Sequence, residues 1–413
     1  MKLRYSGMLA LACGGVLMTV AARPAHAEAD RAGDLKIDRI VLLMRHGVRP
    51  PTKAPSMPAD VTPEKWPDWP VNPGWLTPHG AQAVSALATG DRAELVAAGL
   101  LPLHGCPVAG AVAIVADSDQ RTIATAQSWI RALLPGCGVS IEHRPQESGD
   151  PLFSPGQAAD VTLDQAQAEA DIAAAIGPGG IVALEASQRP LLRRLDAILC
   201  GARPTPCGVS DEPSAIVSPG AGKRPKLSGA LDRASTAAQI LLLEYADGKP
   251  LAQVGWGRAT AADVTALSAF HALEFRIIAR PRTLAAFNVA LLAPRIALAL
   301  TNDAGDAPRV TMLSGHDTNV ASLAGLLDLH WHVPGFAADD PAPGGAIVLE
   351  RLRDARGALY VRAVYRAQTL AQLRAASAIP RYQVVMRISG CRALGLDGLC
   401  TMEQFLKRMA LRP

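Results

Sequence analysis

The stretch from residue 40 to residue 53, IVLLMRHGVRPPTK, constrains the fold of this chain more than any other. Five apolar residues end abruptly in a run of arginine, histidine, glycine and proline. This pattern predicts a buried strand that delivers polar side chains to the rim of a sheet. Ligands of open α/β sheets bind beyond the carboxyl ends of the strands. Arg45 and Arg49, on either side of His46, therefore indicate an anion held against a nucleophile.

Two later segments repeat this arrangement. An apolar run over residues 108–116 is followed by Asp117 to Arg121, and a short predicted strand over 309–313 is followed by Ser314-Gly315-His316-Asp317. If the three strands are parallel neighbours, their loops converge on one pocket. We therefore predict an α/β fold with a mixed central sheet and flanking helices. The residues expected in the pocket are Arg45, His46, Arg49, Arg121, His316 and Asp317.

Residues 151–270 differ in character from the segments on either side. They contain alanine-rich helical patterns separated by segments rich in glycine and proline, and no β-rich run is evident. The helices predicted here cover residues 164–176, 191–199 and 230–245. We expect a smaller α-helical cap at 151–270, inserted into an α/β domain formed by 28–150 and 271–413. A further long helix, interrupted or bent near Pro281 and Pro294, is predicted over 270–300.

The first 27 residues read as a secretory signal peptide. Basic residues precede an apolar run over 7–22, and Ala25-His26-Ala27 supplies a small-x-small cleavage site. We predict cleavage after about Ala27, a periplasmic mature chain, and no membrane association after removal, because the run is too short for a membrane anchor. Removal lowers the basic count from 41 to 38 against 37 acidic residues. The near-neutral balance gives no indication of nucleic-acid binding.

Six cysteines remain after the predicted cleavage. They are Cys106, Cys137, Cys200, Cys207, Cys391 and Cys400. An even count in an exported protein indicates disulfides. Pairing between sequence neighbours is the simplest of the 15 possibilities, and none of those pairs has the spacing of a metal site.

The predicted pocket suits a phosphoryl group. Arginine grips phosphate oxygens with a planar fork and keeps its charge at any relevant pH. The surrounding positive charge should keep His46 neutral and nucleophilic, so that a phosphohistidine can form. Asp317 is the candidate acid for the leaving group, with a pKa that a neighbouring phosphate dianion would raise. His316 would donate a hydrogen bond to a phosphate oxygen.

The run Arg45-His46-Gly47-Val48-Arg49-Pro50-Pro51 and the pair His316-Asp317 resemble the two signatures of the histidine acid phosphatases. Residues 61–80, 255–258 and 343–345 are similar to the bacterial periplasmic branch, which holds the 6-phytases and the glucose-1-phosphatases. The resemblance implies an α/β domain with a helical cap, no metal or other cofactor, and the site roles given above. It also implies the disulfides Cys106–Cys137, Cys200–Cys207 and Cys391–Cys400.

Within that branch, Thr52 and Lys53 resemble phytase residues that contact other phosphates of inositol hexakisphosphate. We therefore expect a phytase, binding a small-molecule phosphate ester as a monomer. The segments around Gln239 and Asn288 lack the methionine, glutamate and arginine expected of a phytase pocket, which keeps a glucose-1-phosphatase or a broad acid phosphatase open. Lys53 as an ordinary solvated lysine is equally open.

Other classes of function remain as alternatives. A phosphomutase can use the same Arg-His-Gly nucleophile, although export, disulfides and an aspartate acid argue against it. A non-enzymatic phosphate-ester binding protein would bind without turnover. Arg121 could instead pair with Asp117 or Asp119. The pair His330 and His332 could hold a metal, but a structural or surface role is favoured because no carboxylate cluster accompanies it.

Overall fold

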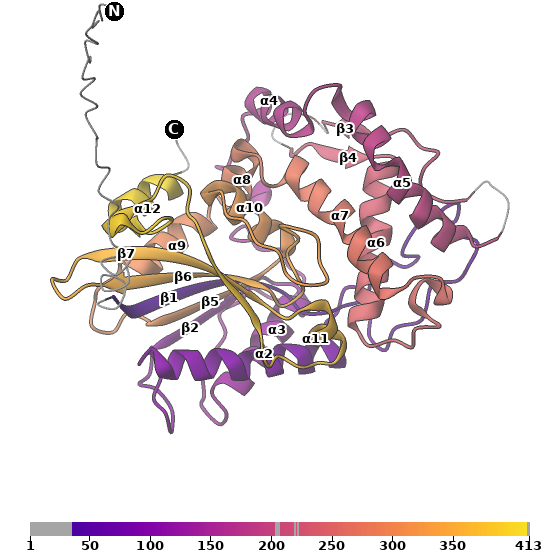
Figure 1. Ribbon diagram of the computed structural model, residues 1–413. Helices are drawn as coiled ribbons and strands as arrows, with labels where there is room; N and C mark the ends of the chain where they lie inside the picture. The colour runs from indigo at the N-terminus through magenta and orange to yellow at the C-terminus, as the bar shows by residue number, and fades with distance from the viewer. Residues whose placement is uncertain (1–34, 203–206, 219, 221–222, 411–413) are drawn as a thin grey trace, which may run out of the picture.

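The computed structural model describes residues 35–202, 207–218, 220 and 223–410 (Figure 1). The predicted signal peptide, residues 1–27, lies outside the described residues. Two lobes stand out in Figure 1, one built around a sheet and the other mainly of helices.

The first lobe is organised around a seven-stranded mixed sheet. Its strand order is β2-β5-β1-β6-β7-β8, with β9 paired to β7. The strands are β1 (Lys36–Arg45), β2 (Val112–Ala116), β5 (Val310–Gly315), β6 (Ala346–Arg353), β7 (Leu359–Ala367), β8 (Tyr382–Met386) and β9 (Cys400–Thr401). β1, β5 and β2 are parallel, whereas β6 to β9 pair antiparallel. The predicted mixed sheet is confirmed.

The three parallel strands end level with one another. Arg45 pairs with Gly315 across β1 and β5, and Ala116 pairs with Ser314 across β2 and β5. The loops that follow therefore leave the sheet at one edge. This register brings the three predicted loops together, as the sequence argument required.

Helices cover both faces of the sheet. α2 (Pro78–Ala97) and α3 (Gln120–Leu133) pack on one face, and α9 (Leu292–Thr301), α10 (Asp317–Leu327) and α12 (Met402–Met409) lie on the other (Figure 1). Alternate residues of β1 point to opposite faces of the sheet and pack in two different cores. Leu42 and Met44 join the core under α2 and α3, whereas Val41 and Leu43 join the larger core that continues into the helical lobe. A strand buried on both faces reads as an uninterrupted apolar run.

The second lobe contains α4 (Gln165–Ile176), α5 (Gly180–Cys200), α6 (Ala230–Ala246) and α7 (Ala261–Ile278). It also contains a two-stranded hairpin of β3 (Ala215–Val217) and β4 (Lys226–Ser228), where the sequence predicted only loop. Strands of three residues are too short for an alternating pattern to reveal them. The predicted division of the chain at residue 270 falls inside α7.

The long helix predicted over 270–300 is interrupted near Pro281, which is one of the two possibilities that the sequence left open. The segment forms the end of α7, then α8 (Arg282–Asn288), then α9. α7 begins at a capping box in which Thr260 and Asp263 satisfy each other's backbone groups. Pro281 precedes α8 directly, where a proline starts a helix rather than bending one. α11 (Leu370–Arg374) completes the elements near the sheet.

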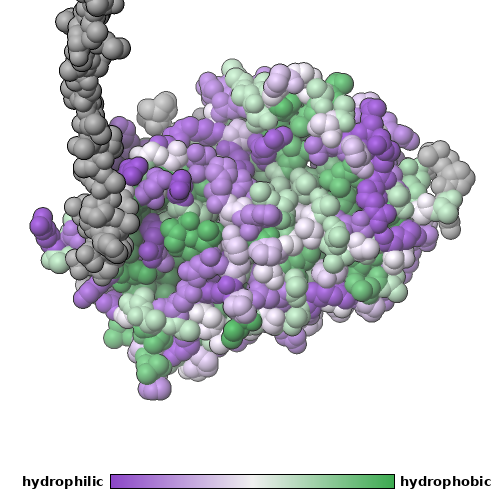
Figure 2. All heavy atoms as spheres, in the orientation of Figure 1, coloured by the Kyte–Doolittle hydropathy of each residue, from purple (hydrophilic) through white to green (hydrophobic). Residues whose placement is uncertain are grey.

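By length and composition alone, residues 165–200 could cross a membrane. Gly177 and Gly179, both with positive φ, divide this stretch into α4 and α5. Residues Leu192, Leu195 and Ile198 of α5 are buried in the protein core, and its outer surface is hydrophilic at the right of Figure 2. The amphipathic pattern is that of a helix at the surface of a folded lobe.

Three disulfides form between the pairs that the resemblance implied. They join Cys106 to Cys137, Cys200 to Cys207, and Cys391 to Cys400. Disulfides persist in oxidising compartments, so these three bonds indicate export from the cytoplasm.

Candidate active site

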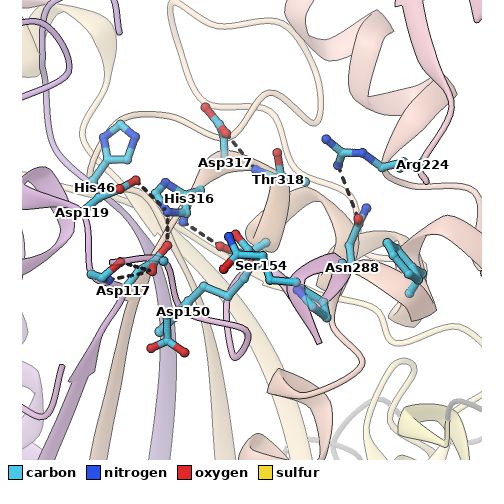
Figure 3. A pocket seen from close by; sticks show the side chains of 18 of the residues that line it. His46, Asp117, Asp119, Asp150, Ser154, Arg224, Asn288, His316, Asp317 and Thr318 are labelled. Carbon is cyan, nitrogen blue, oxygen red and sulfur yellow. Dashed lines mark hydrogen bonds and ion pairs between the residues drawn. The ribbon is translucent and has the colours of Figure 1, made fainter. Parts of the chain in front are cut away.

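The six residues predicted for the pocket lie together at the edge where β1, β2 and β5 end. Five of them, His46, Arg49, Arg121, His316 and Asp317, line a cavity of about 710 Å³. The sixth, Arg45, is buried behind it and contacts the Asp317 carboxylate. Figure 3 shows His46, His316 and Asp317 at one side of this cavity.

His46 is buried and held in one tautomer. Its Nδ1 lies 2.9 Å from the carbonyl oxygen of Gly47, and a carbonyl can only accept, so Nδ1 carries the proton and Nε2 keeps its lone pair. Burial lowers the pKa of His46 well below its usual value, and the charges of Arg121, Arg49 and Arg45 lower it further. A neutral imidazole is also what the sequence led us to expect.

The three arginines differ in how they are engaged. Arg45 donates from Nη2 to Gln239 Oε1 at 3.1 Å and pairs with Asp317 Oδ2 at 2.9 Å. Burial, followed by repulsion from Arg121, lowers the pKa of Arg49 to about 9. Arg121 is paired with the Asp119 carboxylate, which is the alternative that the sequence had left open.

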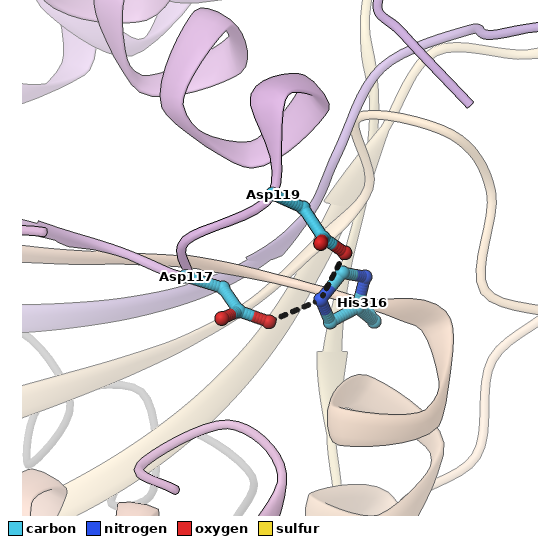
Figure 4. Close-up of side chains that lie close together, drawn as sticks. All are labelled: Asp117, Asp119 and His316. Carbon is cyan, nitrogen blue, oxygen red and sulfur yellow. Dashed lines mark hydrogen bonds and ion pairs between the residues drawn. The ribbon is translucent and has the colours of Figure 1, made fainter. Parts of the chain in front are cut away.

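His316 has both ring nitrogens directed at protein groups. Its Nε2 lies 2.5 Å from Asp117 Oδ2 and 3.5 Å from Asp119 Oδ2, as Figure 4 shows. Its Nδ1 lies 3.4 Å from Arg121 Nη2. Because a carboxylate only accepts and a guanidinium only donates, Nε2 carries a proton towards Asp117 while Nδ1 faces Arg121. The expected bond from His316 to a phosphate oxygen therefore requires a change of partner.

Asp117, Asp119 and His316 offer three ligand atoms within 4.8 Å of one another, a spacing that could hold a metal ion. However, the guanidinium of Arg121 contacts Asp119 and stands beside His316, so positive charge already occupies this position. The cluster is better explained as an anchor for His316 and Arg121.

Asp317 is the first residue of α10. The N-cap of this helix is His316, whose backbone N–H donates to Asn319 Oδ1 at 2.9 Å. Burial opposes ionisation of the Asp317 carboxyl, yet the charges of Arg45 and His271 prevail, so its pKa is lowered in the ligand-free protein. The raised pKa argued from the sequence applies only beside a phosphate dianion.

The chain matches the Histidine phosphatase superfamily (branch 2) over residues 36–180 and 283–366. It belongs to that superfamily. It is 34% identical over 408 residues to the phytase AppA of Escherichia coli, covering 92% of this chain and 93% of that protein. It is 29% identical to a glucose-1-phosphatase of Salmonella typhimurium, covering 96% and 97%. The structure of the Hafnia alvei phytase in complex with tartrate superposes with a TM-score of 0.84 at 33% identity, covering 91% of this chain and 96% of that one.

This histidine acid phosphatase is accordingly a phosphomonoesterase, and the resemblance drawn from the two motifs is confirmed. The fold class does not depend on the two motifs alone. The solved phytase shares the mixed sheet and its helices over nearly the whole chain, so the fold class is shown independently of the motifs.

Thr52 and Lys53 lie apart from the catalytic cavity of this phosphatase. Both are exposed and line a neighbouring cavity of about 670 Å³, together with Thr236 and Gln239 of α6. Arg49 lines both cavities. The structure thus places the two predicted substrate-binding residues next to the site, across Arg49 from it.

His271 of α7 is a residue that sequence reasoning missed. Its Nε2 lies 3.8 Å from Asp317 Oδ2, and its Nδ1 lies 2.6 Å from Asp340 Oδ1. Both His271 and Asp340 are buried. A single histidine within an apolar helical pattern carries no signal of a function, because such residues are usually part of a core.

Three cations on the helical lobe were also missed. They are Lys223 and Arg224, just before β4, and Lys226, its first residue, and all three line the same cavity as His46. Arg224 Nη1 lies 3.4 Å from Asn288 Oδ1 (Figure 3). The basic run 223–226 was visible in the sequence. Its contact with the cavity could not be predicted, because nothing in the local pattern connects it to His46, which lies far away in the chain.

Proposed function

We propose that this phosphatase is an exported enzyme that hydrolyses inositol hexakisphosphate through a phosphohistidine on His46. The observation that supports this most strongly is the state of His46. It is a buried, neutral imidazole with the Nε2 lone pair available, surrounded by Arg45, Arg49 and Arg121. Such a group is a nucleophile for an anionic centre that three guanidinium groups hold in place.

In the first step, His46 Nε2 attacks the phosphorus in line with the ester oxygen. An N–P bond forms, the P–O ester bond breaks, and the leaving alkoxide takes a proton from Asp317. Arg45, Arg49 and Arg121 stabilise the charge on the equatorial oxygens, with His316 donating a further hydrogen bond. For Asp317 to hold this proton, the phosphate dianion must replace it as the partner of Arg45.

In the second step, water attacks the phosphohistidine. Asp317, now a carboxylate, accepts the proton from the water, the N–P bond breaks, and His46 returns to its neutral form. Inorganic phosphate leaves with both charges balanced by the arginines. The same two groups serve both half-reactions, so no metal ion is needed to activate the water.

Phytate is the proposed substrate because it agrees with several independent observations. The relatives include phytases, and a Hafnia alvei phytase structure holds myo-inositol hexakis sulphate, an analogue of that shape and charge. Thr52 and Lys53 line the adjoining cavity and would contact phosphates that are not cleaved. Glucose 1-phosphate is the alternative, supported by the relationship to a glucose-1-phosphatase.

The proposed location is the periplasm, after cleavage near Ala27. The three disulfides favour an oxidising compartment. Sequencing the amino terminus of the secreted protein would test the cleavage site.

The experiment that tests the proposed function is a comparison of kcat/KM on phytate, glucose 1-phosphate and p-nitrophenyl phosphate with the purified mature protein. We expect phytate to exceed glucose 1-phosphate at acidic pH. The reverse order would replace phytate by the alternative. Tight binding of phytate without release of phosphate would contradict the enzymatic assignment altogether.

The proposed mechanism uses no metal ion, and this can be tested separately. Vanadate adopts the pentacoordinate geometry of the transferring phosphoryl group and should inhibit, whereas chelators should leave the rate unchanged. Activity that chelators remove and a divalent ion restores would contradict the mechanism, with Asp117, Asp119 and His316 as the place to look.

A further inference from the structure

The cavity in front of His46 is larger than the reaction requires. A volume of about 710 Å³ is typical of sites that hold a whole small molecule. The transferring phosphoryl group occupies only the side where His46, Arg49 and Arg121 lie. The remaining wall is built from residues 149–157, the segment 223–226 at the β3–β4 hairpin, α8 and the start of α10. It carries charge of its own, negative at Asp150 and positive at the hairpin.

Arg224 is the central cation of that wall. Figure 3 shows its guanidinium projecting into the cavity from the side opposite His46. It donates to Asn288 Oδ1 at 3.4 Å. Among residues 35–202, 207–218, 220 and 223–410, no carboxylate comes within 4 Å of it. A guanidinium has five N–H donors, so most of this group remains available to a ligand.

Asn288 fixes where Arg224 points. The Asn288 side chain is buried, and its Nδ2 donates to Ser322 Oγ at 3.0 Å. This bond leaves Oδ1 to face Arg224 and ties the hairpin to α10, the helix that begins with Asp317. The cation is therefore held by groups rigidly connected to the catalytic helix.

The charges nearby also favour an anion at this wall. Burial disfavours the charged form of Arg224 and lowers its pKa, and the charges of Glu274 and Asp317 only partly offset this effect. A bound anion would supply the missing partner. Lys223 and Lys226 also line the cavity and add positive charge to this wall.

We propose that Arg224, oriented by Asn288, binds a second phosphate group of the substrate, one that is not being cleaved. The ligand class is a polyol that carries at least two phosphates, such as an inositol polyphosphate. A monophosphate ester occupies Arg45, Arg49 and Arg121 and has nothing to offer Arg224. The inference rests on the proposed function and sharpens it, because it assigns the choice between phytate and glucose 1-phosphate to the hairpin.

The test compares Arg224→Gln with wild-type enzyme on phytate and p-nitrophenyl phosphate. We expect the ratio of the two kcat/KM values to fall about tenfold or more, through KM for phytate, since a charge-assisted hydrogen bond is lost. Arg224→Lys keeps the charge but loses the planar guanidinium. Its ratio of kcat/KM values should lie between those of the wild type and Arg224→Gln. Arg193→Gln removes an exposed arginine of α5 and serves as the matched control.

A second readout needs no turnover of phytate. Myo-inositol hexasulfate should inhibit p-nitrophenyl phosphate hydrolysis, with a Ki that rises by a similar factor in Arg224→Gln and stays within about twofold in Arg193→Gln. If Arg224→Gln does not fold, Arg224→Lys still decides the question. An unchanged ratio and an unchanged Ki would overturn the inference.

The two proposals fail in different ways. Wild-type enzyme that hydrolyses p-nitrophenyl phosphate but not phytate contradicts the proposed substrate, while a Ki for hexasulfate that depends on Arg224 would still support the second anion site. Wild-type enzyme that hydrolyses phytate with no contribution from Arg224 leaves the proposed function standing and removes the inference.

Discussion

The two walls of the catalytic cavity are built in different ways. On one wall, His46, Arg49, Arg121 and His316 follow strands that pair in fixed register, so the backbone of the sheet positions them. On the other wall, Arg224 lies two residues before the short strand β4 and contacts Asn288, which orients it. In the proposed account, the strand-end wall binds the phosphoryl group and the hairpin wall binds the rest of the substrate.

This contrast teaches where each property of the enzyme resides. The reaction requires a geometry that does not vary with substrate, and a sheet edge provides it. Substrate choice requires side chains that can change without disturbing the reaction, and loops and short hairpins provide them. Substitutions at the strand-end wall should affect every substrate, whereas substitutions on the helical lobe should affect particular substrates or particular conditions.

The largest expected effect is that of His46→Ala. Without the nucleophile no phosphohistidine forms, so kcat on phytate and on p-nitrophenyl phosphate should both fall by at least about a thousandfold. Steady-state assays of both substrates measure this, with exposed His104→Ala as the control. Retained activity on either substrate would contradict the assignment of the reaction to the strand-end wall.

Asp317→Asn should have a smaller effect that depends on the leaving group. Phytate releases a poor alkoxide that needs a proton, so its rate should fall by about a hundredfold or more, whereas p-nitrophenolate leaves without one. Both substrates share whatever is lost with the Arg45 ion pair. Equal losses on both would exclude Asp317 as the general acid.

His271→Gln should move the pH profile. The charge of His271 helps to lower the pKa of Asp317, so its removal raises that pKa and keeps the acid protonated to higher pH. We expect the alkaline limb of kcat/KM for phytate to shift upward by about one unit. His143→Gln, at an exposed histidine, is the control. If the rate falls equally at every pH and the alkaline limb does not move, His271 has only a packing role.

The smallest expected effect concerns the stability of the helical lobe. Glu244 of α6 is buried and accepts a hydrogen bond from the Gly255 N–H at 3.1 Å. Burial raises its pKa from 4.5 to about 8. The folded protein therefore keeps a proton that the unfolded chain has lost, and the free energy of unfolding should fall as pH rises from about 4.5 to 8, by up to about 1.4 kcal/mol per pH unit.

Glu244→Gln should remove that slope. Thermal unfolding at pH 5 and pH 7.5 measures it, and Glu403→Gln, at an exposed glutamate of α12, should keep the wild-type dependence. A wild-type Tm that is constant between the two values would contradict the raised pKa of Glu244. Greater stability in acid would agree with an acid phosphatase.

The strand-end wall could be predicted from the sequence because each part of it is local. One apolar run stops at Arg45 and another stops before His316. Each run predicts a strand, and the polar residues after it predict the chemistry at the strand's end. The family resemblance supplied the disulfide pairing, which the spacing of the cysteines alone left open.

The hairpin wall could not be predicted in the same way. Arg224 sits in a segment rich in glycine and proline, and its role depends on contacts with Asn288 and Ser322 far along the chain. His271 looks like any residue of an apolar helix until α7 is packed beside α10. Tertiary placement, rather than local pattern, determines both.

The central claim is that His46 carries the phosphoryl group. Mature enzyme mixed rapidly with p-nitrophenyl phosphate and quenched in alkali, in which phosphohistidine survives, can be digested and analysed by mass spectrometry. The account predicts phosphate on the peptide that contains His46, bound to Nε2, with more of it after Asp317→Asn slows the attack of water. Phosphate on any other residue, or an increase in free phosphate with no phosphorylated enzyme in either protein, would contradict the account.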